Sequence, residues 1–316
     1  MTETVGLHHV TAICGDAQRN IDFYCGLLGL RFAKKTVNFD DPETYHTYYG
    51  DGLAAPGTAM TFFPWPEERR GREGAGLVVG TSFAAPAAAL GYWTDRLERA
   101  GTKVERLVRF GEEVVAFKDP DDMSVEIVGR ASVAQVHPWA NSPVPAQEHL
   151  RGFSGVTIAH RDTAATARFL VEALGYRRVG EEGDRTRFET GDGCLADRID
   201  LLRTDDDDDD RGGRIGVGAV HHIAFRAPDR DTLYAHAADL RRHRIEATPI
   251  VDRAYFHSLY FSEPGGVRCE VATDVPGFTR DEPEEFLGQS FKLPVFLEPW
   301  RGRLERTLPP IHDPNA

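Results

Sequence analysis

Two double histidines and two glutamates give this sequence the composition of a metal site. The stretch GLHHVTAI begins at Gly6, and the stretch AVHHIAFR begins at Ala219 in the other half of the chain. The stretches FKDPDDMSVE and FSEPGGVRCE share a Phe-x-x-Pro turn followed by a strand that carries Glu126 or Glu270. Two histidines and one carboxylate form the facial triad of non-heme Fe(II) oxygen chemistry, with positions left open for substrate and dioxygen. The residue types therefore predict a site for a divalent first-row metal.

A repeated unit must position these side chains. Four segments each begin with an apolar strand, pass through a polar break into an amphipathic helix, and end in further strands. The pattern predicts four βαβββ units, which cannot bury their apolar sheet faces alone and must pair. We therefore expect an α+β fold with four βαβββ modules paired into two open-barrel domains. The expected parts are module one at 5–66, module two at 74–130, a linker at 131–151, module three at 152–204, an acidic loop at 205–214, module four at 216–274 and a C-terminal extension at 275–316.

Aligning the units predicts which residues share a position. The aligned residues of the first strands are His9, Val79, Gly155 and His222. The aligned residues of the last strands are Phe62, Glu126 and Glu270, with Asp200 near that position in the third unit. Because a metal needs its ligands together, we expect module four to pair with module one, which gathers His9, His222 and Glu270.

Only one histidine of each doublet can face the metal, because successive residues of a strand point to opposite sides of the sheet. The alignment places the second histidine of each doublet, His9 and His222, at equivalent positions, so we expect these two to face the metal. His8 and His221 then lie on the reverse face, where they can still tune the ligands.

Composition and charge exclude several classes of partner. The 316 residues carry a net charge of −13, which argues against a nucleic-acid partner, since phosphate binding needs clustered Lys and Arg. No apolar run approaches the ~20 residues that span a bilayer, and the first residues lack a signal-peptide pattern. We expect a cytoplasmic protein with no membrane partner, which could form a homo-oligomer. The run Asp205–Asp210 is expected to be a solvated loop.

These units, with ligands on first and last strands, resemble the vicinal oxygen chelate (glyoxalase, bleomycin resistance and dioxygenase) superfamily. More narrowly, the chain is similar to the hydroquinone-type ring-cleaving dioxygenases, the chlorohydroquinone and methylhydroquinone 1,2-dioxygenase group. The stretches that carry this resemblance include LHHVTAICGDAQRNIDFYCGLLGLRFAKKTVNFDDPETYHTYYGD, HPWANSPVPAQEHLRGF, HHIAFRAPD, DRAYFHSLYFSEPGGVRCEV and GFTRDEPEEFLGQ. They cover most of the chain.

The resemblance implies a ligand set and neighbouring groups. It implies one Fe(II), with Mn(II) as an alternative, held by His9, His222 and Glu270. It also implies acid–base and substrate-positioning groups, which by motif are Arg253, Tyr260, His8, Thr11 and His221. His257 lies in the same stretch as Arg253 and is a further candidate, without a counterpart in the family's pattern.

The function expected from the triad and the resemblance is extradiol-type ring cleavage, in which O2 is inserted into a hydroquinone or related diphenol. Tyr260 would supply a proton and Arg253 would hold an anionic substrate or intermediate. One alternative is a glyoxalase-type isomerase or lyase, whose sites generally use four protein ligands; here the fourth position falls on Phe62, which cannot bind a metal. Another is a non-enzymatic protein that binds drugs or small aromatic compounds. A catechol-type enzyme with its ligands in the third and fourth units is disfavoured by Gly155.

Overall fold

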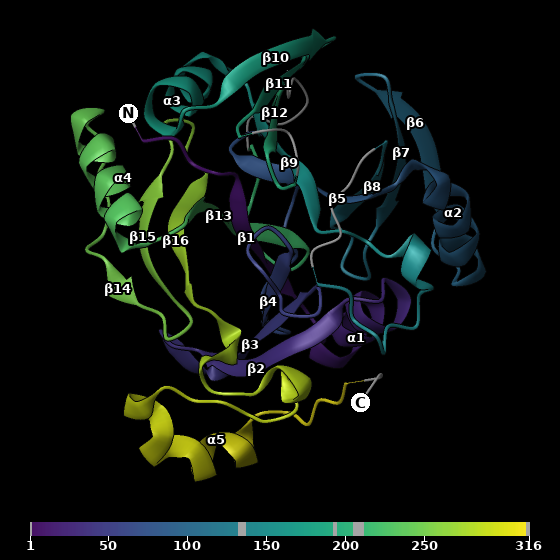
Figure 1. Ribbon diagram of the computed structural model, residues 1–316, viewed down its shortest axis with the longest axis vertical. Helices are drawn as coiled ribbons and strands as arrows, with labels where there is room; N and C mark the ends of the chain where they lie inside the picture. Colours follow the sequence, from purple (N-terminus) through teal and green to yellow (C-terminus); the bar gives the residue numbers. More distant parts are fainter. Residues whose placement is uncertain (1, 132–136, 192–194, 205–211, 314–316) are drawn as a thin grey trace.

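The computed structural model describes residues 2–131, 137–191, 195–204 and 212–313 (Figure 1). The acidic run Asp205–Asp210 lies outside the described residues, as does part of the expected linker. None of the helices in the described ranges is both long and apolar enough to cross a membrane.

Each of four units consists of a strand, a helix and three further strands. The first comprises β1 (Leu7–Cys14), α1 (Ala17–Ile21), a π-helical turn (Asp22–Leu27), β2 (Arg31–Asn38), β3 (Asp41–Gly50) and β4 (Ala59–Pro64). The second comprises β5 (Leu77–Pro86), a 3₁₀ turn (Ala87–Ala89), α2 (Leu90–Arg99), β6 (Val104–Arg109), β7 (Glu112–Lys118) and β8 (Ser124–Arg130). The third, after a 3₁₀ turn (Ala146–Glu148), comprises β9 (Phe153–His160), α3 (Ala164–Leu174), β10 (Arg177–Glu182), β11 (Arg185–Glu189) and β12 (Arg198–Arg203). The fourth comprises β13 (Ala219–Ala227), α4 (Arg230–Arg242), β14 (Val251–Asp252), β15 (Phe256–Ser262) and β16 (Arg268–Pro276).

The strands form two eight-stranded sheets, in the orders β14-β15-β16-β13-β1-β4-β3-β2 and β10-β11-β12-β9-β5-β8-β7-β6. The first sheet combines strands of the first and fourth units, and the second combines strands of the second and third units (Figure 1). At the centre of each sheet, two first strands run antiparallel, and each lies parallel to the last strand of its own unit. The predicted fold class, α+β with paired βαβββ units, is confirmed.

Capping residues set the ends of the longer helices. The Asp229 carboxylate accepts a hydrogen bond of 2.8 Å from the Thr232 amide at the start of α4, which satisfies one of its free N–H groups. Gly175 ends α3 with φ of 77°, a left-handed conformation that glycine adopts at little cost. These helix boundaries allow the chain to turn back into the sheet after each helix.

The C-terminal extension packs along the first unit, where α5 (Arg301–Thr307) contacts β3 (Figure 1). Before α5 the extension forms 3₁₀ turns at Phe278–Arg280, Glu284–Phe286 and Val295–Trp300. Lys34 on β2 is fully buried, and its ammonium group binds Glu282 and, at 2.7 Å, Asp281. A buried charge is stable only when paired, so this lysine fixes the start of the extension against the sheet.

The strand registers correct two of the sequence alignments by one residue. In the first sheet His9 lies opposite Ala224 and Thr11 opposite His222, so a local twofold relation makes Thr11 equivalent to Ala224. Ala224 pairs with Glu270, and Thr11 pairs with Thr61. Thr61, rather than the predicted Phe62, is therefore the counterpart of Glu270.

The second sheet follows the same relation. Gly80 lies opposite Thr157, and Ser82 lies opposite Gly155, which makes Gly80 and Gly155 the counterparts of the two histidines. The predicted Val79 is again one residue from the observed counterpart. A one-residue shift moves a side chain to the other face of the sheet, which is why these errors matter.

Candidate metal centre

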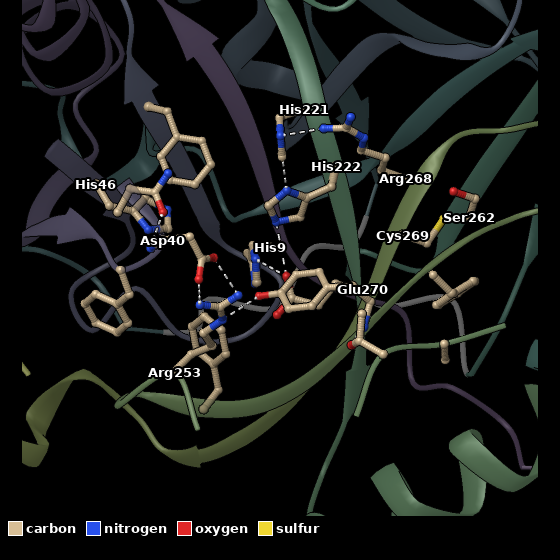
Figure 2. A pocket seen from close by; sticks show the side chains of 18 of the residues that line it. His9, Asp40, His46, His221, His222, Arg253, Ser262, Arg268, Cys269 and Glu270 are labelled. Carbon is tan, nitrogen blue, oxygen red and sulfur yellow. Dashed lines mark hydrogen bonds and ion pairs between the residues drawn. The ribbon is translucent and has the colours of Figure 1, made fainter. Parts of the chain in front are cut away.

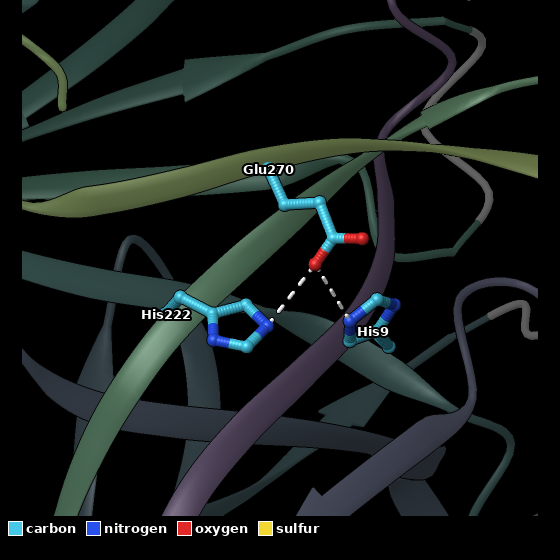
Figure 3. A group of neighbouring side chains, drawn as sticks. All are labelled: His9, His222 and Glu270. Atoms are coloured by element: carbon cyan, nitrogen blue, oxygen red, sulfur yellow. Dashed lines mark ion pairs between the residues drawn. The ribbon is translucent and has the colours of Figure 1, made fainter. Parts of the chain in front are cut away.

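Three side chains from three neighbouring strands converge in the first sheet (Figure 3). One ligand atom each from His9 on β1, His222 on β13 and Glu270 on β16 lies within 4.8 Å of the others. Glu270 Oε2 is 3.3 Å from His9 Nε2 and 3.1 Å from His222 Nε2. All three residues are buried, and Glu270 is fully so.

The environment of Glu270 fits a bound divalent cation. Neither carboxylate oxygen has a hydrogen-bond partner among the described residues, although both imidazoles are within ion-pair distance. Burial by itself would raise the pKa of Glu270, but His9 and His222 outweigh it and hold that pKa well below its usual range. Burial lowers the pKa of His222 and favours its neutral form. A buried anion among nitrogen donors is the arrangement that a metal satisfies.

The first histidine of each doublet supports the second. His8 Nδ1 lies 2.9 Å from His9 Nδ1, and His221 Nδ1 lies 2.8 Å from His222 Nδ1. Burial, together with the adjacent histidine, lowers the pKa of His8 and that of His221 to about 3 each. A neutral imidazole has one N–H and one lone pair, so each outer ring fixes the tautomer of its neighbour.

The two doublets end on different partners. The outer nitrogen of His8 lies 3.1 Å from the Thr273 carbonyl oxygen, to which it can only donate. Donation there leaves His8 Nδ1 to accept a hydrogen bond from the N–H at His9 Nδ1, so that His9 Nε2 presents its lone pair to the site. In contrast, Arg268 donates a hydrogen bond of 2.9 Å to His221 Nε2, which gives this doublet the opposite polarity (Figure 2).

Arg253 and Tyr260 lie together at the wall of the site. The Arg253 Nε–H donates to the Tyr260 hydroxyl oxygen at 3.1 Å, and its two terminal nitrogens bind the Asp40 carboxylate at 3.2 and 2.9 Å. Ser258 also donates to the Tyr260 oxygen, at 3.2 Å. Burial, and then the charge of Glu270, raise the pKa of Tyr260, so its phenol stays protonated. With two donors on its oxygen, the Tyr260 proton is free to point toward a ligand.

A hydrogen-bonded chain occupies the corner opposite Glu270. Thr11 and Thr61 share a hydrogen bond of 2.8 Å, His46 Nε2 lies 2.9 Å from the Thr61 hydroxyl, and the Tyr48 hydroxyl lies 2.8 Å from His46 Nδ1. Burial, with the neighbouring site histidines, holds the pKa of His46 well below its usual range. The corner where a fourth protein ligand would lie is therefore uncharged. His46 is not among the residues predicted from the sequence, although it alternates with Tyr48 on one strand.

A cavity of about 730 Å³ opens over the three candidate ligands. Much of its wall is aromatic, from Phe39, Tyr48, Phe63, Trp65, Phe256 and Tyr260. The ring centroids of Phe63 and Trp65 lie 5.2 Å apart, and those of Phe63 and His46 lie 4.4 Å apart, which makes a continuous surface of rings. Such a wall suits a flat aromatic ligand.

The structure places some predicted residues away from this cavity. His257 does not line it, and the backbone N–H of this residue donates to the Thr273 hydroxyl at 3.0 Å. Strand alternation explains this, because the flanking Phe256 lines the cavity and His257 therefore points to the other face. Thr11 and His8 do not line the cavity and reach it only through Thr61 and His9. The predicted position on the reverse face is wrong for His221, which lines the cavity, because a register shift beside it in the pairing of β1 with β13 changes the strand alternation. Phe62 packs in the core, with its ring centroid 4.8 Å from that of Tyr24.

Comparison with known proteins identifies the superfamily to which this chain belongs. The sequence profile of the Glyoxalase/Bleomycin resistance protein/Dioxygenase superfamily matches residues 6–127 and 152–271. The chain belongs to this superfamily. The superfamily match spans the four units, and the resemblance stated from the sequence is confirmed at this level.

Two of the relatives carry dioxygenase names. The chain is 42% identical over 309 residues to MhqO of Bacillus subtilis, provisionally named a ring-cleaving dioxygenase, covering 98% of this chain and 97% of that one. It is 35% identical over 312 residues to the chlorohydroquinone/hydroquinone 1,2-dioxygenase of Sphingobium indicum, covering 96% and 95% of the two chains.

Two solved structures are also similar to this chain. A crystal structure from Bacillus subtilis, provisionally described as a dioxygenase, matches with a TM-score of 0.95 and 40% identity over 100% of both chains. Maize glyoxalase I matches with a TM-score of 0.63 at 16% identity, over 85% of this chain and 92% of that one, which shows a shared fold.

Proposed function

We propose that this protein is an Fe(II)-dependent dioxygenase that inserts O2 into the ring of a hydroquinone or a related diphenol. The observation that carries the proposal is that the group of candidate ligands found among the described residues has three side chains, His9, His222 and Glu270, with the uncharged Thr61 at the fourth corner. A four-ligand isomerase site would need a metal-binding side chain there, so Thr61 favours ring cleavage over the glyoxalase-type alternative. The names of the relatives support the same class of reaction.

The side chains of the site suit a diphenol. His9, His222 and Glu270 would hold the metal, which supplies the redox chemistry that couples a diphenol to dioxygen when bound. The aromatic wall would hold the ring in a plane. Tyr260, protonated and oriented by Arg253, would donate a proton to the oxygen that develops charge during ring opening.

The experiment that tests this proposal combines metal content with oxygen uptake. The protein is loaded with Fe(II) under argon, then mixed with oxygenated buffer and hydroquinone, methylhydroquinone, chlorohydroquinone or catechol. We expect one iron per chain and one O2 consumed per hydroquinone, with both lost in His222→Ala. Iron without oxygen uptake on any diphenol would contradict ring cleavage, and a chain that binds no metal would contradict the metal centre as well.

A further inference from the structure

An ion pair joins two turns across the edge of the cavity (Figure 2). Asp40 lies in the tight turn between β2 and β3 of the first unit, and Arg253 lies in the turn between β14 and β15 of the fourth. Both Asp40 carboxylate oxygens bind Arg253, at 3.2 and 2.9 Å, in the bidentate geometry that guanidinium groups form with carboxylates. The Asp40 side chain is 72% exposed and that of Arg253 only 22% exposed, so Asp40 covers Arg253 from the solvent side.

The pair matters because Arg253 is one of few charged groups that face the cavity. The charged lining residues other than histidine are Asp40, Glu246, Arg253, Arg268 and Glu270. Together they carry one net negative charge, which a divalent metal changes to one positive charge. A singly deprotonated diphenol would neutralise that charge. A ligand with an additional carboxylate would find Arg253 already occupied, because Asp40 holds its two terminal nitrogens. The other arginine of the lining, Arg268, is exposed to solvent and donates to His221.

We propose that Asp40 is a specificity-determining residue: by occupying Arg253, its carboxylate makes the cavity prefer uncharged diphenols over diphenols that carry a ring carboxylate. The inference rests on the proposed function and adds a substrate class to it. A carboxylated diphenol must either displace Asp40 from Arg253 or lie beside its negative charge. Both cost binding free energy.

The size of the effect follows from exposure. Because Asp40 is largely solvated, water screens its charge and can replace Arg253 as its partner, so the discrimination is moderate. Removing one screened charge near a ligand carboxylate corresponds to a change of about tenfold in relative affinity.

The test compares two ligands that differ by one carboxylate. Hydroquinone and 2,5-dihydroxybenzoate are titrated into the Fe(II)-loaded full-length protein under argon, and the dissociation constants are measured by calorimetry. Because oxygen is absent, the readout is binding rather than turnover. We expect Asp40→Asn to shift the ratio of the two dissociation constants about tenfold in favour of 2,5-dihydroxybenzoate.

Three further variants test whether the effect depends on the bond between Asp40 and Arg253 or only on the negative charge in the cavity. Glu246→Gln removes a carboxylate that lines the same cavity outside the pair, and we expect it to change the ratio less than about twofold. Asp40→Glu retains the charge and should retain the wild-type preference. The double variant Asp40→Asn with Arg253→Gln should lose the gain, since the gain requires an uncovered guanidinium group. Thermal unfolding of each variant checks that it is folded.

The outcomes distinguish two failures. If wild-type protein binds hydroquinone but Asp40→Asn leaves the ratio unchanged, or shifts it no more than Glu246→Gln does, the inference is wrong and the proposed function stands. If the loaded wild-type protein binds neither diphenol, the proposed function and the inference fail together.

Discussion

The two sheets of this protein place carboxylates at equivalent positions and satisfy them in different ways. In the first sheet Glu270, paired with Ala224, faces the imidazoles of His9 and His222. In the second sheet the counterpart Glu126 is paired with Ser82. Glycines stand where the first sheet has its histidines, so the second sheet has no nitrogen donors at these positions.

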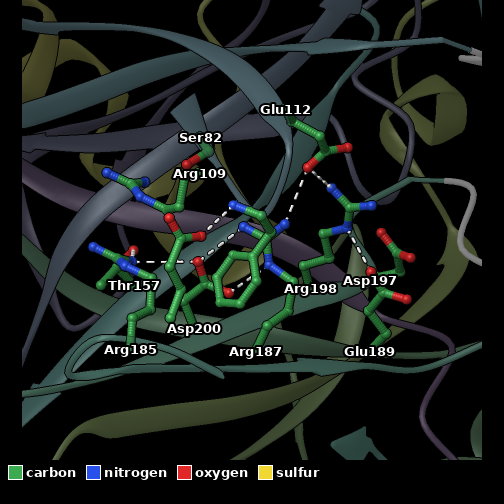
Figure 4. Close-up of polar contacts among 12 residues, drawn as sticks. Ser82, Arg109, Glu112, Thr157, Arg185, Arg187, Glu189, Asp197, Arg198 and Asp200 are labelled. Atoms are coloured by element: carbon green, nitrogen blue, oxygen red, sulfur yellow. Dashed lines mark hydrogen bonds and ion pairs between the residues drawn. The ribbon is translucent and has the colours of Figure 1, made fainter. Parts of the chain in front are cut away.

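In the second sheet, arginines bind the buried carboxylates (Figure 4). Arg109 binds both oxygens of Glu126, at 3.0 and 2.8 Å. Arg187 binds both oxygens of Asp200, the counterpart of Thr61, at 2.8 and 3.0 Å, and its remaining terminal nitrogen binds Glu112 at 3.0 Å. Each of these three carboxylates is bound by at least one arginine.

The difference shows what a buried carboxylate requires. Removing such a group from water is costly unless a positive charge accompanies it. The second sheet supplies that charge from the chain itself. The first sheet places the imidazoles of His9 and His222 beside Glu270, and we expect the balancing positive charge to come from a bound metal.

The largest effect should come from exchanging the two equivalent glutamates for glutamine. We expect Glu270→Gln to lose most of its iron and at least about a thousandfold in ring-cleavage rate, since a metal contributes several kcal/mol to such reactions. Glu126→Gln should keep one iron per chain, because its carboxylate serves Arg109. Metal analysis and oxygen uptake on both variants test this; equal iron loss in both would remove the distinction between the sheets.

The next largest effect should be on stability in the second sheet. Arg187→Met leaves Asp200 buried without its main cation, and we expect the free energy of unfolding to fall by about 3 kcal/mol or more. The exposed pair of Arg99 and Asp95 provides the control, since Arg99→Met should cost less than about 1 kcal/mol. Urea unfolding measures both variants. A small loss for Arg187→Met, or loss of iron in it, would contradict the division of roles.

The smallest effect concerns the covering helices. His236 in α4 is fully buried, its two ring nitrogens have no hydrogen-bond partner among the described residues, and burial lowers its pKa to about 4. The unfolded chain takes up this proton below about pH 6.5 while the folded chain does not, so stability falls as the pH drops from 6.5 toward 4. The equivalent residue of α3 is Phe169, which is likewise buried.

We therefore expect His236→Phe to reduce the loss of unfolding free energy between pH 7 and pH 5 by about 2 kcal/mol. Phe169→Leu, a change of similar kind on the other helix, should leave the pH dependence as it is in the wild type. Urea unfolding at the two pH values tests this, and an unchanged slope in His236→Phe would show that His236 does not contribute.

Much of the architecture could be predicted from the sequence because the units repeat. The fold class needed only the order of apolar strands, helices and turns. The errors came from register: alignment on the turn proline took Phe62 for Thr61, and alignment on the starts of the first strands took Val79 for Gly80. In a strand such a shift exchanges the two faces, and no local pattern corrects it, since Phe62 and Thr61 are both ordinary strand residues.

Contacts between turns that are far apart in the sequence could not be predicted. Asp40 and Arg253 are 213 positions apart, and only the pairing of β1 with β13 brings their turns together. The same holds for His46, whose place opposite Glu270 depends on the order of strands in the sheet. The triad remains a prediction about metal binding; its three side chains converge in the structure.

The opposite polarity of the two histidine doublets links the buried site to the surface. A cation on Nε2 of His222 needs the lone pair there, so the proton of that ring must be on Nδ1 and point to His221. His221 must then carry its own proton on Nε2, facing Arg268, and two donors cannot share a hydrogen bond. Arg268, an exposed side chain, would be released whenever the centre is filled, while the bond from His8 to the Thr273 carbonyl would persist. One of the two doublets would thus couple metal binding at the buried centre to a change at the protein surface.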